Sequence, residues 1–273
     1  MVAQATERGL SQRRACGLAG LARSTARYAA RPGQDAPLAA ELAQIKQKYP
    51  RFGIRRAHAL LRAKGQVVNH KRVERVWRGS GLQVPQRPKK RRLKTGRTVP
   101  RQAQPPDHVW SYDFQEDGLL SGRKMRLLNI IDEFTREWLS VTVGVSLTSR
   151  AVIAALAALF ASRSTPAFVR SDNGPEFIAA EVQAWLQESG SAPHYIDPGC
   201  PWQNGFTESF HGKLRDEFLD REAFASVPEA QVRLETQRVW YTAERPHSSL
   251  KYVAPAAFAR AWRQEQAETQ PPR

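Results

Sequence analysis

The sequence predicts an α/β fold, with a mixed five-stranded sheet flanked by helices and preceded by a small all-helical region. Charge divides the chain: residues 1–106 contain 25 Lys and Arg against 4 Asp and Glu, and residues 107–273 contain 17 against 22. Apolar residues follow helical spacing in the first part, whereas strand-like runs alternate with helical ones in the second. A basic helical region joined to a mildly acidic α/β region indicates a nucleic-acid-binding module followed by a catalytic one.

Residues 1–31 are expected to form a basic helical hairpin. Two short helical patterns, SQRRACGLAG and LARSTARYAA, are separated by small residues. Their proportions fit a DNA-binding helix-turn-helix, and they fit equally well a hairpin that only packs. The sequence leaves both interpretations open.

Residues 38–84 contain three further helical patterns, at 38–49, 54–65 and 69–81. The third begins with Asn69, a favourable N-cap, and Val73, Val76 and Trp77 would face the core. The remaining positions carry cations that we expect to contact DNA: Lys71, Arg72, Arg75 and Arg78. A solvated basic helix is the alternative, but three short helices of which the last is basic favour a helix-turn-helix-like DNA-binding domain.

Residues 85–106 are expected to be a basic linker between the two parts. The segment is poor in apolar residues and contains a run of four cations, Lys89, Lys90, Arg91 and Arg92. Because neutralising a phosphate releases counterions, such a run adds non-specific affinity for DNA. A nuclear-import signal is the alternative explanation of the same residues.

The catalytic part is expected at residues 107–223. Strand patterns occur at 108–117, 125–134, 138–145, 167–172 and 194–199, and helical patterns at 149–163, 179–190 and 204–219. Strands in series followed by alternating helix and strand describe a layered sandwich of the ribonuclease-H-like kind. Residues 224–273 are expected to be a C-terminal helical extension with a long helix at 228–242.

Three carboxylates in this part stand in unusual local sequences. Asp113 follows an apolar run in WSYDF, Asp172 ends another in RSDNGPEF, and Glu208 lies in the helical QNGFTESFHGKLRDE. Acids at these places would converge at one edge of the sheet. Converging carboxylates are ligands that Mg²⁺ or Mn²⁺ prefers, and two such ions can stabilise a phosphodiester displacement. Each acid alone could be a cap or a surface charge, but that interpretation suits all three poorly.

Nearby residues offer weaker candidates. Glu176 is a second-choice metal ligand, placed near Asp172. His211 lies one helical turn after Glu208 and could be a proton shuttle, a phosphate contact or a surface histidine. Asp132 and Glu133 are interpreted as structural residues at a strand end, with Asp132 possible near the site.

Composition argues against other classes of protein. Cys16 and Cys200 cannot form a zinc site by themselves. The longest apolar stretch, residues 151–161, is too short to cross a bilayer. We therefore expect a reduced, intracellular protein without a membrane partner.

Taken together, the motifs resemble those of a known family. WSYDF, MRLLNIIDEFTRE, RSDNGPEF, PGCPWQNGFTESFHGKLRDEF and ERPHSSLKYVAPAAF are similar to the integrase catalytic core of retroviral integrases and bacterial insertion-sequence transposases. The sequence resembles most the second-reading-frame (OrfB) product of the insertion-sequence three family. YPRFGIRRAHALLR and VNHKRVERVWRGSGL resemble the helix-turn-helix segment of that product, so the resemblance covers nearly the whole chain.

The resemblance implies a DDE-type transposase in which Asp113, Asp172 and Glu208 hold two Mg²⁺ or Mn²⁺ ions. Arg215, seven residues after Glu208, stands where the family keeps a Lys or Arg that is thought to contact end DNA. A surface ion pair is the alternative for Arg215. Trp202 either stacks on a base or packs.

The resemblance also implies partners. These are double-stranded DNA, as inverted-repeat ends and as target, further copies of the chain on that DNA, and an upstream reading-frame product as partner or fusion. The implied location is the bacterial cytoplasm, at the nucleoid. A ribonuclease-H-like nuclease without strand transfer and a non-catalytic DNA-binding regulator are the alternative functions.

Overall fold

A computed structural model describes residues 1–27, 35–85, 105–172, 174, 179–195 and 204–269. Within it the chain forms two compact units, residues 1–44 and residues 45–273. The predicted linker cations Lys89, Lys90, Arg91 and Arg92, together with Trp202, Glu176 and Cys200, lie outside the described residues.

The first unit contains three short helices, α1 (Val2–Glu7), α2 (Gln12–Leu18) and α3 (Arg23–Ala26). Ser11 caps α2, because its side chain accepts a hydrogen bond from the backbone N–H of Arg14. Few side chains are buried here; Ala15 and Cys16 on α2 are. The predicted pair of helices is therefore present, and α1 precedes it unpredicted.

Helix α4 (Ala36–Lys48) spans the boundary between the units, and α5 (Ile54–Ala63) and α6 (His70–Gly79) follow. The predicted cap of α6 is confirmed, since the Asn69 side chain accepts a hydrogen bond of 2.9 Å from the N–H of Lys71. Val73, Val76 and Trp77 are buried, as their spacing predicts.

The second unit is built on a sheet of five strands in the order β3-β2-β1-β4-β5. The strands are β1 (Val109–Gly118), β2 (Lys124–Asp132), β3 (Trp138–Gly144), β4 (Phe168–Ser171) and β5 (Ala192–Tyr195). β1 pairs antiparallel with β2 and parallel with β4, so the sheet is mixed. This strand order confirms the ribonuclease-H-like α/β fold predicted from the sequence.

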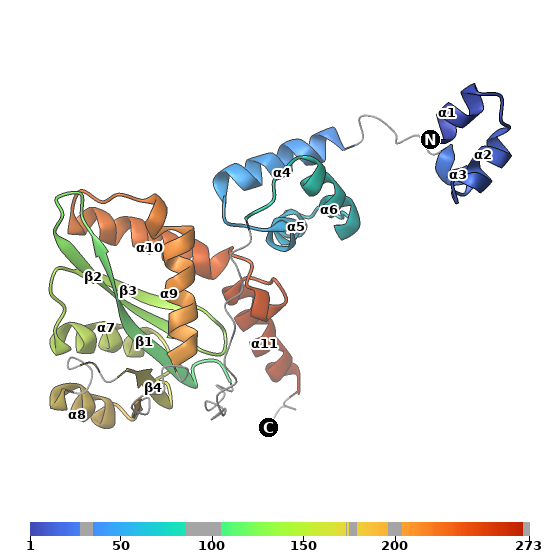
Figure 1. Cartoon of the computed structure of the whole chain (residues 1–273). Coiled ribbons are helices and arrows are strands. Elements are labelled where there is room, and N and C mark those ends of the chain that lie inside the picture. The colour runs from blue at the N-terminus through green and yellow to red at the C-terminus, as the bar shows by residue number, and fades with distance from the viewer. Residues whose placement is uncertain (28–34, 86–104, 173, 175–178, 196–203, 270–273) are drawn as a thin grey trace. The chain divides into compact units, whose positions relative to one another are not determined.

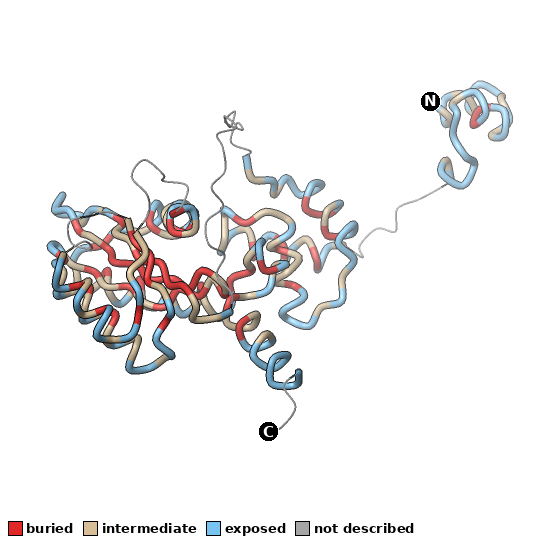
Figure 2. Tube along the Cα trace, turned by 90° about the horizontal axis from the view of Figure 1, so that it is seen from below, coloured by how far each residue is buried: buried red, intermediate tan, exposed pale blue. Residues whose placement is uncertain are grey.

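Helices cover both faces of the sheet (Figure 1). On one face, α7 (Ser149–Ser162) and α8 (Ala180–Glu188) bury Val152, Leu156, Val182 and Leu186 against Trp110 and other strand residues. On the other face, α9 (Gly205–Glu217) and α10 (Val227–Ala243) pack on β2 and β3. Figure 2 shows the buried residues concentrated in the sheet between these layers.

The structure differs from the predicted elements at a few places. β5 ends at Tyr195, and residues 196–199 of the predicted fifth strand lie outside the described residues. Helix α11 (Pro255–Thr269) and two short 3₁₀ turns, η2 (Leu219–Arg221) and η3 (Ser248–Leu250), are unpredicted. α10, placed by the sequence in a separate extension, contributes Leu234 and Tyr241 to the core beneath α9. No helix in the described part of the chain is long and apolar enough to span a membrane.

Candidate active site

Strand pairing brings Asp113 and Asp172 together. β1 and β4 are parallel, with Ser111 paired to Arg170. Asp113 and Asp172 each stand two residues beyond this pair, so continuing the register leads to neighbouring positions for them, and the charge of Asp172 acts on Asp113. Asp113 also lies opposite Asn129 of the neighbouring strand β2.

Glu208 approaches the same place from the first turn of α9. Burial raises the pKa of Asp113 to about 7, and the charges of Asp172 and Glu208 push it in the same direction. Hydrogen bonds to the carboxylate partly oppose this rise: the N–H of Phe114 donates at 2.7 Å and the Asn204 amide at 3.3 Å. The three predicted acids thus interact electrostatically in the folded chain, although they are far apart in sequence.

The donor types suit a hard divalent cation, because all three are carboxylates. Asp172 is oriented by the N–H of Gly174, which donates to Oδ1 at 3.0 Å. Among the described residues, no three His, Cys, Asp or Glu side chains converge tightly enough to form a metal-binding group. Asp113, Asp172 and Glu208 therefore fit the ion in chemistry, and their role as its ligands stays a prediction.

The His211 side chain is largely buried beside Asp113, so its interpretation as a surface histidine is wrong. Its side chain is 14% exposed, and Nδ1 lies 3.9 Å from Oδ2 of Asp113. Nε2 lies 3.2 Å from the amide nitrogen of Asn129. Burial lowers the pKa of His211 to about 4, and the charge of Arg215 adds to the effect. At neutral pH the imidazole is uncharged, and with the Asn129 amide as its donor, Nδ1 carries the proton that faces Asp113.

Arg215 lies on the same side of α9 as Glu208. Its guanidinium donates to the backbone oxygen of Glu116 at 2.5 Å, and it lies 3.9 Å from Asp117 and 3.8 Å from Asp220. These contacts tie Arg215 to the end of β1 while leaving 42% of its side chain exposed. The contact of Arg215 with DNA stays a prediction.

The cations of α6 are all exposed: Lys71, Arg72, Arg75 and Arg78. Arg78 forms an ion pair with Glu74 one turn earlier, at 2.6 Å. Exposure makes the four residues available to a phosphate backbone, and their DNA contacts likewise stay predictions.

Asp132 and Glu133 have structural roles, as expected from the sequence. Asp132 is fully buried and accepts hydrogen bonds from the N–H groups of Phe134 and Thr135, which closes the turn between β2 and β3. Glu133 accepts two hydrogen bonds of 2.7 Å from the buried Arg170. These pairs fix the strand edge on which Asp172 stands.

Sequence reasoning missed Asn129 and the contact made by Asn204. Asn129 is fully buried in the apolar run of β2, and a polar residue in such a run was the available signal. Asn204 is buried immediately before α9, where it reaches Asp113. The Asn129 amide thus holds the His211 imidazole, and the Asn204 amide holds the Asp113 carboxylate.

Comparison with known proteins gives this site a family context. Two Integrase core domain models match residues 103–201 and 189–255, and an HTH-like domain model matches residues 34–90. The chain is 38% identical over 251 residues to an uncharacterized 31.7 kDa protein of insertion element IS407 from Burkholderia multivorans, covering 92% of this chain and 91% of that protein. The chain belongs to the insertion-element family of integrase-core proteins. The resemblance to the insertion-sequence three family is thereby confirmed.

A second relative agrees with this membership. An uncharacterized 39.2 kDa protein of insertion element IS476 from Xanthomonas euvesicatoria is 39% identical over 264 residues, which is 96% of this chain and 76% of that protein. Among solved structures, the catalytic core domain of HTLV-2 integrase in complex with magnesium is similar, with a TM-score of 0.46 and 18% identity over 56% of this chain and 97% of that one.

Proposed function

We propose that this protein is a DDE-type DNA transposase. In this reaction the enzyme cuts DNA at the ends of its insertion element and then joins the freed 3′-hydroxyl to target DNA. The observation that supports the proposal is the parallel pairing of β1 with β4, whose register leads toward Asp113 and Asp172, together with the effect of the Asp172 and Glu208 charges on Asp113.

We assign Asp113, Asp172 and Glu208 as the ligands of Mg²⁺ or Mn²⁺. When bound, these ions would supply stabilisation of the attacking and leaving oxygens of a phosphodiester displacement. The protein's part is to hold the carboxylates in place. Phe114 and Asn204 orient Asp113, and Gly174 orients Asp172.

Both steps are displacements at phosphorus, and neither needs a covalent protein–DNA intermediate. In the first, water adds to the phosphate at the element's end, and the strand breaks to leave a 3′-hydroxyl. In the second, that hydroxyl adds to a target phosphate, and a target 3′-oxygen leaves. Consequently no serine or tyrosine nucleophile is required, which separates this proposal from serine and tyrosine recombinases.

The remaining residues serve DNA binding in this proposal. Arg215 contacts end DNA beside Glu208, and the α6 cations Lys71, Arg72, Arg75 and Arg78 contact phosphates or base edges. Lys89, Lys90, Arg91 and Arg92 follow the DNA backbone, and Trp202 meets a base. We further propose that several copies assemble on the two element ends at the bacterial nucleoid, with an upstream reading-frame product as partner or fusion.

The test uses the full chain with a pre-nicked, end-labelled duplex that carries the terminal repeat of its own element, in Mn²⁺. We expect cleavage and joining products from the parent and none from Asp172→Asn. Glu188→Gln, which neutralises an exposed acid at the end of α8, is the matched control and should retain the products.

Equal products from the parent and Asp172→Asn would refute the ligand assignment. Cleavage without joining would favour a ribonuclease-H-like nuclease. If the chain binds DNA but neither cuts nor joins it, even when the upstream reading-frame protein is present, a non-catalytic regulator would be favoured.

A further inference from the structure

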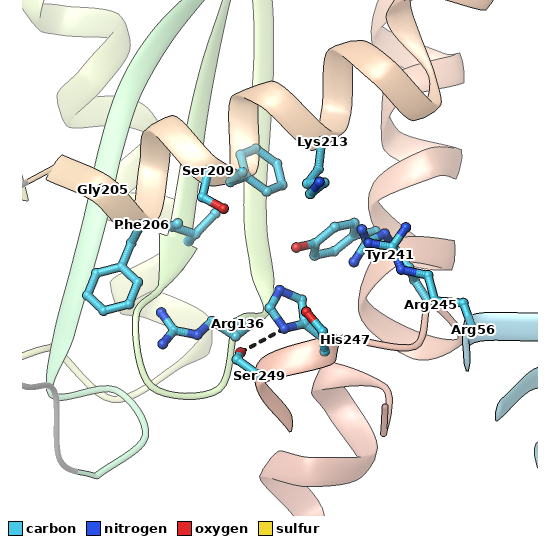
Figure 3. Close-up of a pocket in the computed structure, with 13 residues that line it drawn as sticks. Arg56, Arg136, Gly205, Phe206, Ser209, Lys213, Tyr241, Arg245, His247 and Ser249 are labelled. Atoms are coloured by element: carbon cyan, nitrogen blue, oxygen red, sulfur yellow. Dashed lines mark hydrogen bonds between the residues drawn. The ribbon is translucent and has the colours of Figure 1, made fainter. Parts of the chain in front are cut away.

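A cavity of about 380 Å³ opens beside α9 (Figure 3). Glu208, His211 and Arg215 follow one another at helical spacing on one side of α9, whereas Phe206, Ser209 and Lys213 lie roughly opposite. The cavity is therefore separate from the carboxylates, although both share this helix. Its volume is within the range of small-ligand sites, about 300–1,000 Å³.

The cavity wall is strongly basic. Arg56, Arg136, Lys213 and Arg245 line it, and no Asp or Glu is among the described residues that do. The hydroxyl groups of Ser209, Ser248 and Ser249 add hydrogen-bond donors. Figure 3 shows side chains from α9, the turn after β2 and the segment after α10 directed toward a common space.

Acids lie behind this wall: Glu133 and Asp132 act on Arg136, and Glu217 is hydrogen-bonded to two other cations of the wall. Glu217 accepts hydrogen bonds of 2.6 and 2.7 Å from Arg245 and of 2.6 Å from Arg56. Arg245 is 2% exposed, so this bonding holds its guanidinium rigidly at the cavity. One carboxylate between two guanidinium groups leaves the cluster positively charged, even before Arg136 and Lys213 are counted.

Among the described cations of the wall, Arg136 has a buried nitrogen without a hydrogen-bond partner. Its guanidinium lies 4.0 Å above the ring of Phe206. Nη1 of Arg136 is buried, and among the described residues it has no hydrogen-bond partner. A buried donor without a partner costs on the order of 1–3 kcal/mol, so its retention calls for a physical explanation.

The backbone of Arg136 is also strained. Its φ of 64° lies in the left-handed region, where a side chain costs roughly 1–2 kcal/mol and glycine costs nothing. The N–H of Arg136 donates to the backbone oxygen of Asp132 at 2.9 Å, which fixes this turn between β2 and β3. An arginine where glycine is the unstrained choice indicates that its side chain serves a purpose in the cavity.

His247 reports the positive potential of the cavity. Burial lowers its pKa to about 3, and the charges of Arg245, Arg136 and Arg56 add to this effect, against a smaller opposing effect of Glu217. The imidazole is thus neutral, and its Nδ1 lies 2.8 Å from the Ser249 hydroxyl. Burial disfavours a charge of either sign, but the charges of Arg245, Arg136 and Arg56 favour an anion in the space beside His247.

We propose that this cavity binds a backbone phosphate of DNA, with Arg136 and Lys213 as its principal contacts. Arginine and lysine beside hydroxyl groups are the usual ligands of a phosphate. Phe206 and Tyr241 give the cavity an apolar wall, against which the sugar or base attached to that phosphate can rest. The source of the phosphate rests on the proposed function, because a transposase must hold DNA on more than one surface.

Arg136→Gly combined with Lys213→Ala tests the proposal in the full chain. The glycine removes the guanidinium and also relieves the backbone strain, so this variant should fold at least as well as the parent. Arg150→Ala, which removes an exposed cation on α7 at the other face of the sheet, is the matched control. Thermal melting of all three proteins checks the fold.

The measurement is fluorescence anisotropy with a labelled duplex in EDTA, over a range of salt. We expect the double variant to bind about tenfold more weakly at 0.1 M salt, and the slope of log K against log salt to be shallower by about one. Arg150→Ala should keep the parental slope. An unchanged affinity and slope in the double variant would overturn the proposal.

Inorganic phosphate provides the second arm. If millimolar phosphate raises the melting temperature of the parent but not of the double variant, while both bind DNA equally, the cavity takes free phosphate and the DNA proposal is wrong. The anisotropy measurement is made in EDTA, without a divalent ion, so its outcome is independent of cleavage. The two proposals can therefore fail separately. If the parent does not cut DNA but the double variant shows the shallower salt slope, the cavity assignment stands and the proposed chemistry is refuted.

Discussion

The two sides of α9 have opposite electrostatic character. Toward Glu208, carboxylates gather, and the pKa of Asp113 is raised to about 7. Toward Lys213, guanidinium and ammonium groups gather, and the pKa of His247 is lowered to about 3. Burial shifts each group toward its neutral form, and like charges around it add to the shift.

Each side of α9 carries an excess of one sign of charge that the protein itself does not neutralise. Like charges close together raise the free energy of the folded protein, and ordinary packing does not reward such an arrangement. Each side would be stabilised by a ligand of the opposite sign: a cation among the carboxylates and an anion in the cavity. A single helix can thereby hold a metal-dependent site and a phosphate in a fixed relation.

The largest expected effect comes from Glu208 on α9. Glu208→Gln removes a proposed metal ligand, and we expect cleavage to fall by at least about a thousandfold, equivalent to roughly 4 kcal/mol of transition-state stabilisation. Ala225→Gly, at an exposed site between α9 and α10, should leave the rate nearly unchanged. Single-turnover cleavage of a labelled duplex measures both. Comparable cleavage rates for Glu208→Gln and the parent would contradict the assignment of Glu208 as a metal ligand.

A smaller but still large effect should come from Glu217, one of the acids behind the basic cavity. Burial raises its pKa, but the hydrogen bonds and charges of Arg245 and Arg56 outweigh this, so the pKa ends below its ordinary value. Glu217→Ala leaves two guanidinium groups without their anion, and we expect a loss of about 3–5 kcal/mol in the free energy of unfolding.

The control for Glu217 is Glu235→Ala, which removes the exposed end of an ion pair with Arg238 on α10. Exposed pairs contribute about 0–1 kcal/mol, so this variant should remain close to the parent. Urea denaturation of both variants measures the difference. If the two lose the same stability, the Arg56–Glu217–Arg245 cluster does not fix the cavity wall.

The smallest expected effect has the opposite sign. Because the pKa of Asp113 is raised in the folded state, its carboxyl group favours folding least when it is ionised. In EDTA at pH 8, Asp113→Asn should therefore be more stable than the parent by at least about 1.4 kcal/mol, the equivalent of one pKa unit. The melting temperature should rise by a few degrees.

The pH dependence of this difference follows from the same shift. Below about pH 4 the carboxyl group is protonated in both folded and unfolded chains, so the parent loses nothing. As pH rises toward 7 the parent loses stability relative to Asp113→Asn, and above pH 7 the difference is constant. Added Mn²⁺ should stabilise the parent and not the variant. If the parent is more stable than Asp113→Asn at pH 8 in EDTA, the raised pKa of Asp113 in the folded state is contradicted.

Much of the fold follows from local patterns in the sequence. Alternation and apolar runs identified the strand that contains Asp113 and the strand that ends just before Asp172, and helical spacing placed Val73, Val76 and Trp77 on the buried face of α6. The family resemblance rests on contiguous motifs and also needed no coordinates. These features depend on residues that are near one another in the chain.

Tertiary structure alone decided the surroundings of the site. Arg56, Arg136, Lys213 and Arg245 come from separate elements, and only the packing of α9 and α10 on the sheet brings them around one cavity. The burial of His211 likewise depends on the sheet beneath α9. Local sequence determined which elements form, because backbone propensity and periodicity act over short distances. The charges that each group meets were decided by contacts between distant segments, because burial and Coulomb interactions depend on distance in space.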